Sequence, residues 1–94
     1  MIERTTRLSL ARQVRLKLDP RSGKQMLLYP EKGLELNDTA ARVAALCFEP
    51  RTVGEIVERM AAAAGAATPR AQIEDEVLAF LRALEDRGLV VVHP

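Results

Sequence analysis

Apolar and polar residues alternate in the first third of the chain, a period of two that is typical of strands. Within residues 12–18, Val14, Leu16 and Leu18 share one face while basic residues occupy the other, which predicts a half-buried strand. Residues 1–11 show no clear period. We therefore expect a mobile N-terminal arm over residues 1–11, followed by a single domain over residues 12–94.

A hairpin is expected next. Residues 19–24 are dense in turn formers, and residues 25–29 read as the returning strand. Pro30 ends that strand because proline cannot donate a ladder hydrogen bond. Residues 31–33 predict a second turn, and residues 34–36 alternate again as a short third strand.

The apolar spacing then changes from two to that of helices. Asn37 is a suitable N-cap for a helix over residues 39–47. Thr52 and Glu55 form a capping box for a second helix, which Gly65 ends. The apolar stripe of this second helix consists of Val53, Ile56, Val57, Met60 and Ala61.

A third helix is expected to open at Thr68 and Pro69, with the proline at the first helical position, and to end before Gly88. Residues 89–92 are β-branched and predict a terminal strand or a docked tail. The fold class is therefore α+β: a small N-terminal three-stranded antiparallel sheet followed by three helices, winged helix-turn-helix-like. The expected core stripe of the third helix is Ile73, Val77, Phe80, Leu81 and Leu84.

Composition is that of an ordinary folded domain, with 48% apolar and 29% charged residues in 94. The net charge of +1 argues against a nucleic-acid binder that relies on bulk charge. It conceals an asymmetry, because residues 1–32 carry +5 and residues 33–94 carry −4. No apolar run reaches the ~18 residues of a membrane span, so we expect no membrane partner and a cytoplasmic location.

Few residues could support catalysis. The nucleophile candidates are Ser9 in the arm, Ser22 in a turn and Cys47 on the apolar face of a helix, where a cysteine usually behaves as a small hydrophobe. His93, the only histidine, is the next-to-last residue and is expected at a frayed C-terminus. One cysteine and one histidine exclude a Cys/His zinc site within one chain. We expect no enzyme, no metal and no bound cofactor.

Two binding functions remain open. A winged-helix reader of nucleic acid needs a basic recognition helix, but residues 69–88 carry three arginines against five acids. A peptide binder needs a strand edge with unpaired backbone groups beside a helix, and the short third strand offers one. The edge could also pair with that of a second copy, so a homodimer is possible.

Three segments resemble one family, the pyrroloquinoline quinone biosynthesis protein D (PqqD) family. Residues 27–41 (LLYPEKGLELNDTAA) are similar to its "LLYPEG…LNxTA" segment, and residues 51–57 to its "RTVxEIV" helix start. Residues 75–90 resemble its "DVxxFLxxLxxxGLV" ending. Lys32 stands where the family more often has glycine.

The resemblance implies a non-enzymatic peptide chaperone, a recognition element for ribosomally made and modified peptides. Such a protein binds the precursor peptide of pyrroloquinoline quinone (PQQ), PqqA, and presents it to a radical S-adenosylmethionine (SAM) enzyme, PqqE, which crosslinks a Glu and a Tyr. PQQ is then the product of the pathway rather than a bound cofactor. A winged-helix nucleic-acid-binding regulator is the alternative, and a purely structural subunit of the radical enzyme is a third possibility.

In the family, the peptide adds to the third strand and packs against the third helix. Carried onto this sequence, the third strand supplies main-chain hydrogen bonds, and residues flanking the core stripe of the third helix line the groove. Leu78 is the preferred apolar contact, since it lies off that stripe. The expected peptide-binding residues are Gly33, Leu34, Glu35, Leu36, Glu74, Asp75, Leu78 and Arg82.

Overall fold

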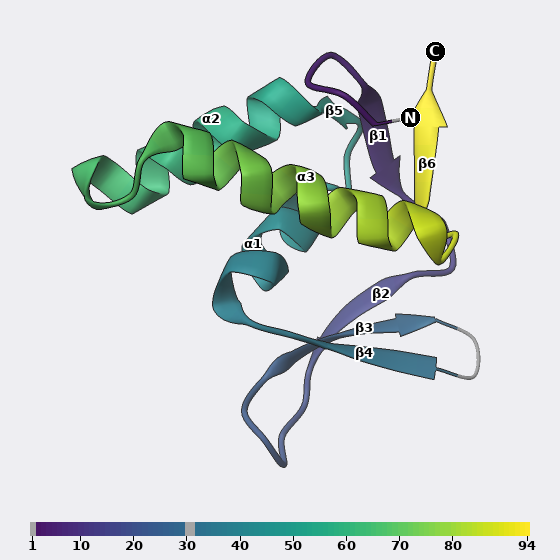
Figure 1. Ribbon diagram of the computed structural model, residues 1–94. Helices are drawn as coiled ribbons and strands as arrows, with labels where there is room; N and C mark the ends of the chain where they lie inside the picture. Colours follow the sequence, from purple (N-terminus) through teal and green to yellow (C-terminus); the bar gives the residue numbers. More distant parts are fainter. Residues whose placement is uncertain (1, 30–31) are drawn as a thin grey trace.

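The computed structural model describes residues 2–29 and 32–94 and combines two small sheets with three α-helices (Figure 1). The α+β class and the predicted N-terminal sheet followed by three helices are confirmed. In chain order the elements are β1 (Arg7–Leu10), β2 (Arg15–Leu18), β3 (Gln25–Tyr29), β4 (Lys32–Leu36), α1 (Asp38–Leu46), β5 (Arg51–Thr52), α2 (Val53–Ala64), the 3₁₀ turn η1 (Gly65–Ala67), α3 (Arg70–Asp86) and β6 (Val90–His93).

The predicted sheet has the strand order β2-β3-β4, and both pairings are antiparallel. The turn between β2 and β3 is closed by Asp19, whose carboxylate accepts hydrogen bonds from the Arg21 amide and the Ser22 hydroxyl. Gly23 supplies the positive φ of 73° that the turn requires. The third strand begins earlier than expected, because Lys32 and Gly33 belong to β4 rather than to a turn. The predictions for Pro30 and Glu31 lie outside the described residues.

A second sheet, which the sequence analysis missed, takes the place of the mobile arm expected over residues 1–11. Its order is β5-β1-β6, so β1 pairs on both sides with strands from distant parts of the chain. Ile2 and Leu8 are fully buried. The pairing partners of β1 lie more than 40 residues away in sequence, and a local pattern search cannot detect them. His93 is likewise part of β6 rather than a frayed end.

The helix ends follow the predicted caps. The Asn37 side chain accepts a hydrogen bond from the Ala40 amide at 2.8 Å, and Thr52 and Glu55 form the capping box of α2. Gly65 ends α2 with a φ of 66°. One detail differs, since Pro69 is the N-cap of α3 rather than its first helical residue.

Helix α3 crosses the molecule between the two sheets and supplies the centre of the core (Figure 1). Four of the five predicted stripe residues are buried, and Phe80 is only half-buried at the margin. Leu18, expected to share the buried face of its strand with Val14, is the last residue of β2 and is 53% exposed. The buried stripe consists of Ile73, Val77, Leu81 and Leu84.

We expect Leu8→Ala to lower the free energy of unfolding by about 2–5 kcal/mol, because it removes a fully buried side chain and leaves a cavity. Leu18→Ala, the same substitution at an exposed position, should cost less than about 1 kcal/mol. Urea unfolding followed by circular dichroism measures both values. Equal and small effects would show that the N-terminal segment is an unpacked arm after all.

Candidate functional site

Strand β4 is the outer edge of the β2-β3-β4 sheet and carries the four predicted strand residues. Among the described strands it pairs only with β3, so alternate backbone N–H and C=O groups on its other side have no strand partner. Leu36 is buried and Leu34 is half-buried, both on the face toward the core. Glu35 is exposed and pairs with Lys24, with its Oε1 3.0 Å from Nζ.

Gly33 has a packing role within this strand. A Cβ built at this position would lie 2.9 Å from Cε of Met26 and 3.4 Å from a methyl group of Leu28. Both side chains therefore lean across β4 on the face of the sheet away from the core. Glycine allows that close approach without a side chain of its own.

The structure does not bring Glu74 and Arg82 to β4. Arg4 donates to the Glu74 carboxylate at 2.7 Å, and Arg82 donates to the carbonyl oxygen of Ile2 at 3.1 Å. These bonds fasten the N-terminal segment to α3, on the side of the helix toward the β5-β1-β6 sheet (Figure 1). Two further residues of this flank were expected to bind peptide, namely Asp75, which is exposed, and Leu78, which is half-buried against the core.

The opposite flank of α3 lies toward β4. We define the α3 row as Glu76, Phe80, Ala83 and Arg87, which are three or four positions apart and so share one side of the helix. At one end of the row, the Arg87 guanidinium is 3.5 Å from the hydroxyl of Tyr29, the residue that pairs with Lys32 of β4.

At the other end of the row, Glu76 lines a hollow together with Thr39 and Arg42 of α1, the helix that follows β4 directly. Since β4 runs from Lys32 toward α1 while α3 runs from Glu76 toward Arg87, the strand and the row are antiparallel neighbours. The site therefore consists of the β4 edge and the α3 row.

The sequence predicted the strand that forms the edge of this sheet but did not predict the α3 row, and the peptide-binding role of both stays a prediction. Phe80 was assigned to the core, and Glu76 was not among the expected peptide-binding residues. Both flanks of an amphipathic helix border its apolar stripe, and periodicity does not say which flank meets a given strand. The available signal was an aromatic residue at the edge of the stripe, since Phe80 is more exposed than the other four residues of the predicted stripe.

The site has an apolar middle and charged ends. Leu34 on β4 and Phe80 on α3 are both half-buried. Glu76 provides a negative charge near the start of α1, while Arg87 and Lys32 provide positive charges at the far end. An extended segment placed along β4 can therefore exchange backbone hydrogen bonds, bury an apolar side chain and direct a carboxylate to the basic end.

The nucleophile candidates lie elsewhere. Ser9 and His93 are joined across β1 and β6, with Oγ and Nε2 2.8 Å apart. Neither residue lines the β4 edge or the α3 row, and among residues 2–29 and 32–94 no carboxylate hydrogen-bonds to the imidazole. Cys47 is fully buried, and this burial raises the pKa of its thiol to about 12, while the nearby Arg51 charge partly opposes the shift. Ser9, His93 and Cys47 therefore all lie outside the candidate peptide site.

The family model described as "Coenzyme PQQ synthesis protein D (PqqD)" matches residues 24–90, a range that contains β4 and the whole of α3. The chain belongs to this family. Both halves of the site therefore lie within the part that is shared with other PqqD proteins.

Relatives of this PqqD-family chain carry the name "PqqA binding protein". One from Bradyrhizobium diazoefficiens is 33% identical over 89 residues, which cover 95% of this chain and 84% of the relative. Another, from Stutzerimonas stutzeri, is 36% identical over 80 residues, covering 84% and 83% of the two chains. The similarity to these relatives thus extends through nearly the whole domain.

Solved structures confirm the fold. The solution structure of the PqqD part of PqqCD from Methylobacterium extorquens, described as a stand-alone recognition element for ribosomally made peptides, has a TM-score of 0.81 and 27% identity, covering 97% of this chain and 95% of the other. TbiB1 in complex with the TbiA(β) leader peptide has a TM-score of 0.73 at 22% identity, covering 92% and 98%. At that identity the second match speaks for the fold alone.

The described residues contain neither a membrane-spanning helix nor a cluster of metal ligands. No helix within residues 2–29 and 32–94 has the length and apolar character needed to cross a membrane. In the same part of the chain, no three His, Cys, Asp or Glu side chains are grouped closely enough to bind a metal ion. The cytoplasmic location stays a prediction.

We expect Cys47 to react with a thiol reagent far more slowly in the folded protein than in the denatured chain. The thiolate is the reactive form, and the raised pKa of about 12 together with full burial suppresses both its population and its access. The measurement is the rate of disulfide exchange with an aromatic disulfide at about pH 8, with and without concentrated guanidinium chloride. Similar rates in both conditions would contradict the packing described for this residue.

Proposed function

We propose that this chain is a non-enzymatic peptide chaperone of PQQ biosynthesis. It binds the ribosomal precursor peptide, PqqA, as an added strand on β4, and presents the peptide to PqqE, the radical SAM enzyme that crosslinks a Glu and a Tyr. The chain holds no cofactor itself, and PQQ is the product of the pathway. The observation that carries the proposal is the unpaired β4 edge beside the α3 row in a member of the PqqD family.

Strand addition suits this site because it requires little sequence complementarity. The backbone of residues 33–36 offers hydrogen bonds to any extended segment, so affinity comes from the main chain. Selection comes from the side chains beside it. Leu34 and Phe80 provide an apolar surface, and Arg87 with Lys32 favours a carboxylate at one end.

The flank of α3 that bears Glu74 and Arg82 has a different task in this proposal. Its hydrogen bonds to Arg4 and Ile2 hold the N-terminal segment against the helix. That support fixes the angle at which α3 lies across the molecule, and with it the position of the α3 row relative to β4.

A nucleic-acid regulator is less consistent with α3. The helix carries two arginines, Arg70 and Arg82, against five acidic residues. The acidic residues are Glu74, Asp75, Glu76, Glu85 and Asp86. A recognition helix with a net negative charge would be repelled by phosphates in the major groove.

The test is an amide NMR titration of the labelled chain with synthetic PqqA peptide at two salt concentrations. We expect saturable shifts at residues 33–36 and along the α3 row, little changed by salt, because backbone hydrogen bonds do not depend on counterion release. Duplex DNA serves as the second titrant. Binding of DNA but not of peptide, with a steep salt dependence, would replace this function by the regulator. Binding of PqqE without any affinity for free peptide would indicate a structural subunit.

We expect Phe80→Ala to weaken peptide binding about tenfold, since it removes the aromatic contact beside β4. Leu78→Ala is the matched control, because Leu78 is a half-buried apolar residue on the opposite flank of the same helix. Its dissociation constant should stay within about twofold of the wild-type value. Isothermal titration calorimetry measures both, with thermal melts to confirm that each variant is folded. The reverse order of effects would place the peptide on the Leu78 flank.

A further inference from the structure

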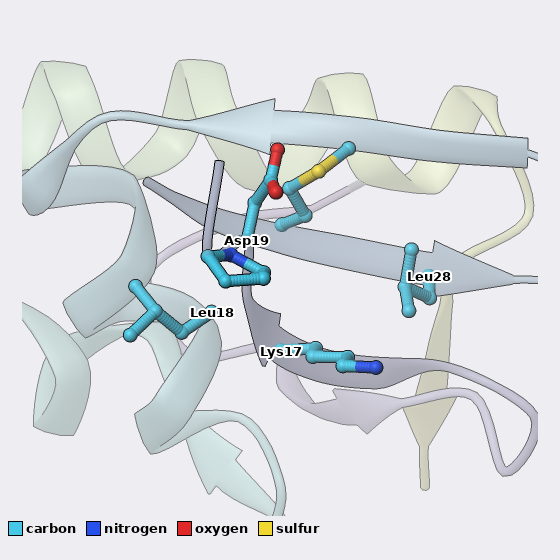
Figure 2. Close-up of a pocket in the computed structure, with 6 residues that line it drawn as sticks. Lys17, Leu18, Asp19 and Leu28 are labelled. Carbon is cyan, nitrogen blue, oxygen red and sulfur yellow. The ribbon is translucent and has the colours of Figure 1, made fainter. Parts of the chain in front are cut away.

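The solvent-facing side of the β2-β3-β4 sheet carries an apolar strip bordered by cations. In the β2–β3 pairing, Arg15 lies opposite Leu28 and Lys17 lies opposite Met26, on the side of the sheet away from buried Leu27. A hollow of about 160 Å³ opens over these strands (Figure 2), and a second one of about 390 Å³ adjoins it. We define the outer patch as Arg15, Lys17, Met26 and Leu28 of this side, together with Leu18 at the end of β2 and Phe48 after α1, which line the same hollows.

The outer patch includes two large apolar side chains that are about half exposed to solvent. Leu18 is 53% exposed and Phe48 is 50% exposed, and each lines one of the two hollows. Lys17 and Leu28 line both hollows, which makes the surface continuous. Gly33 allows Met26 and Leu28 to lie flat across the sheet. Apolar surfaces of this kind, bordered by polar residues, are typical of protein interaction sites.

Charge identifies the kind of partner. Within the described part of the chain, Arg15 and Lys17 take part in no ion pair, whereas Arg4 and Lys24 do. The single described acid that lines either hollow is Asp19, and its carboxylate already accepts hydrogen bonds in the β2–β3 turn. The outer patch is therefore positive around an apolar centre and is complementary to an acidic surface with an exposed apolar side chain.

The position of the outer patch leaves the peptide site free. The patch lies over β2 and β3, and its edge strand is β2, whereas the proposed peptide edge is β4 on the opposite side of the same sheet. The α3 row lies on the other side of that sheet, the side that faces the core, and is turned toward β4. A folded partner on the outer patch and a peptide on β4 can thus be bound at the same time.

We propose that the outer patch is the docking surface for an acidic, apolar-centred face of the enzyme that modifies the bound peptide. This inference rests on the proposed function. It assigns peptide and enzyme to opposite edges of one small sheet. A second copy of this chain is a poorer occupant, because two positive patches would repel each other at close range.

The test compares two double variants of the full chain with equal changes in net charge. Arg15→Glu with Lys17→Glu inverts the charge of the outer patch. Arg21→Glu with Arg59→Glu inverts two exposed cations that line neither hollow and form no ion pair among the described residues. Affinity for purified PqqE is measured by biolayer interferometry, with and without saturating PqqA peptide. Affinity for the peptide alone is measured by calorimetry on the same samples.

We expect the patch variant to lose at least about tenfold in affinity for the enzyme and the control to stay within about twofold. Peptide affinity should be unchanged in both. Phe48→Ser should weaken enzyme binding without a change of charge, and added salt should weaken the wild-type complex.

Other results would overturn the assignment in distinct ways. If the patch variant binds the enzyme as tightly as the wild type does, the enzyme docks elsewhere. If the control variant loses as much affinity as the patch variant, the loss is due to the change in net charge and not to the outer patch. Loss of peptide affinity in the patch variant alone would make the patch part of the peptide site. Failure of the wild-type chain to bind peptide at all would instead refute the proposed function, and calorimetry detects that separately.

Discussion

The burial of the apolar stripe of α3 is the interaction on which the rest of this structure depends. A three-stranded sheet whose strands have only two to five residues is marginal by itself, and the described part of this domain contains two such sheets. Ile73, Val77, Leu81 and Leu84 form one core cluster with buried residues of both sheets, such as Leu8 and Leu27. Because one helix serves both sheets, its two flanks must differ, and the functional division of the molecule follows from that difference.

Local signals in the sequence predicted most of the local structure. The β2–β3 hairpin, the Asn37 and Thr52 caps and the helix stop at Gly65 depend on residues a few positions apart, and all are present. The second sheet could not be found this way. Strand β1 is only four residues long, and it pairs with β5 and β6, which are distant in the sequence. The expected third strand was correct in place because its alternation continues directly into a capped helix.

The site divides in the same manner. Its strand was predictable because β4 is the last of three consecutive strands and is followed directly by a helix, which leaves it at the edge of the sheet. Its helical half was not, since periodicity shows that α3 has an apolar stripe but not which flank is turned toward β4. That choice is made by the Arg4–Glu74 and Arg82–Ile2 hydrogen bonds on one side and the Arg87–Tyr29 contact on the other. Each joins residues more than 50 positions apart, so only the folded chain reveals them.

The pairing of β1 with β6 has a consequence for how the protein is made. Strand β1 cannot pair with β6 until residues 90–93 have been synthesised, because Leu8 and Leu10 lie opposite Val92 and Val90. While the ribosome is still elongating, residues 7–10 can pair only with the two-residue β5, and Leu8 lacks its full cover. The β2–β3–β4 hairpins, in contrast, can form from neighbouring residues as soon as they emerge. The β4 edge can thus form early in synthesis, whereas the α3 row is made only shortly before β6, and the nascent chain remains exposed to misassembly until β6 is present.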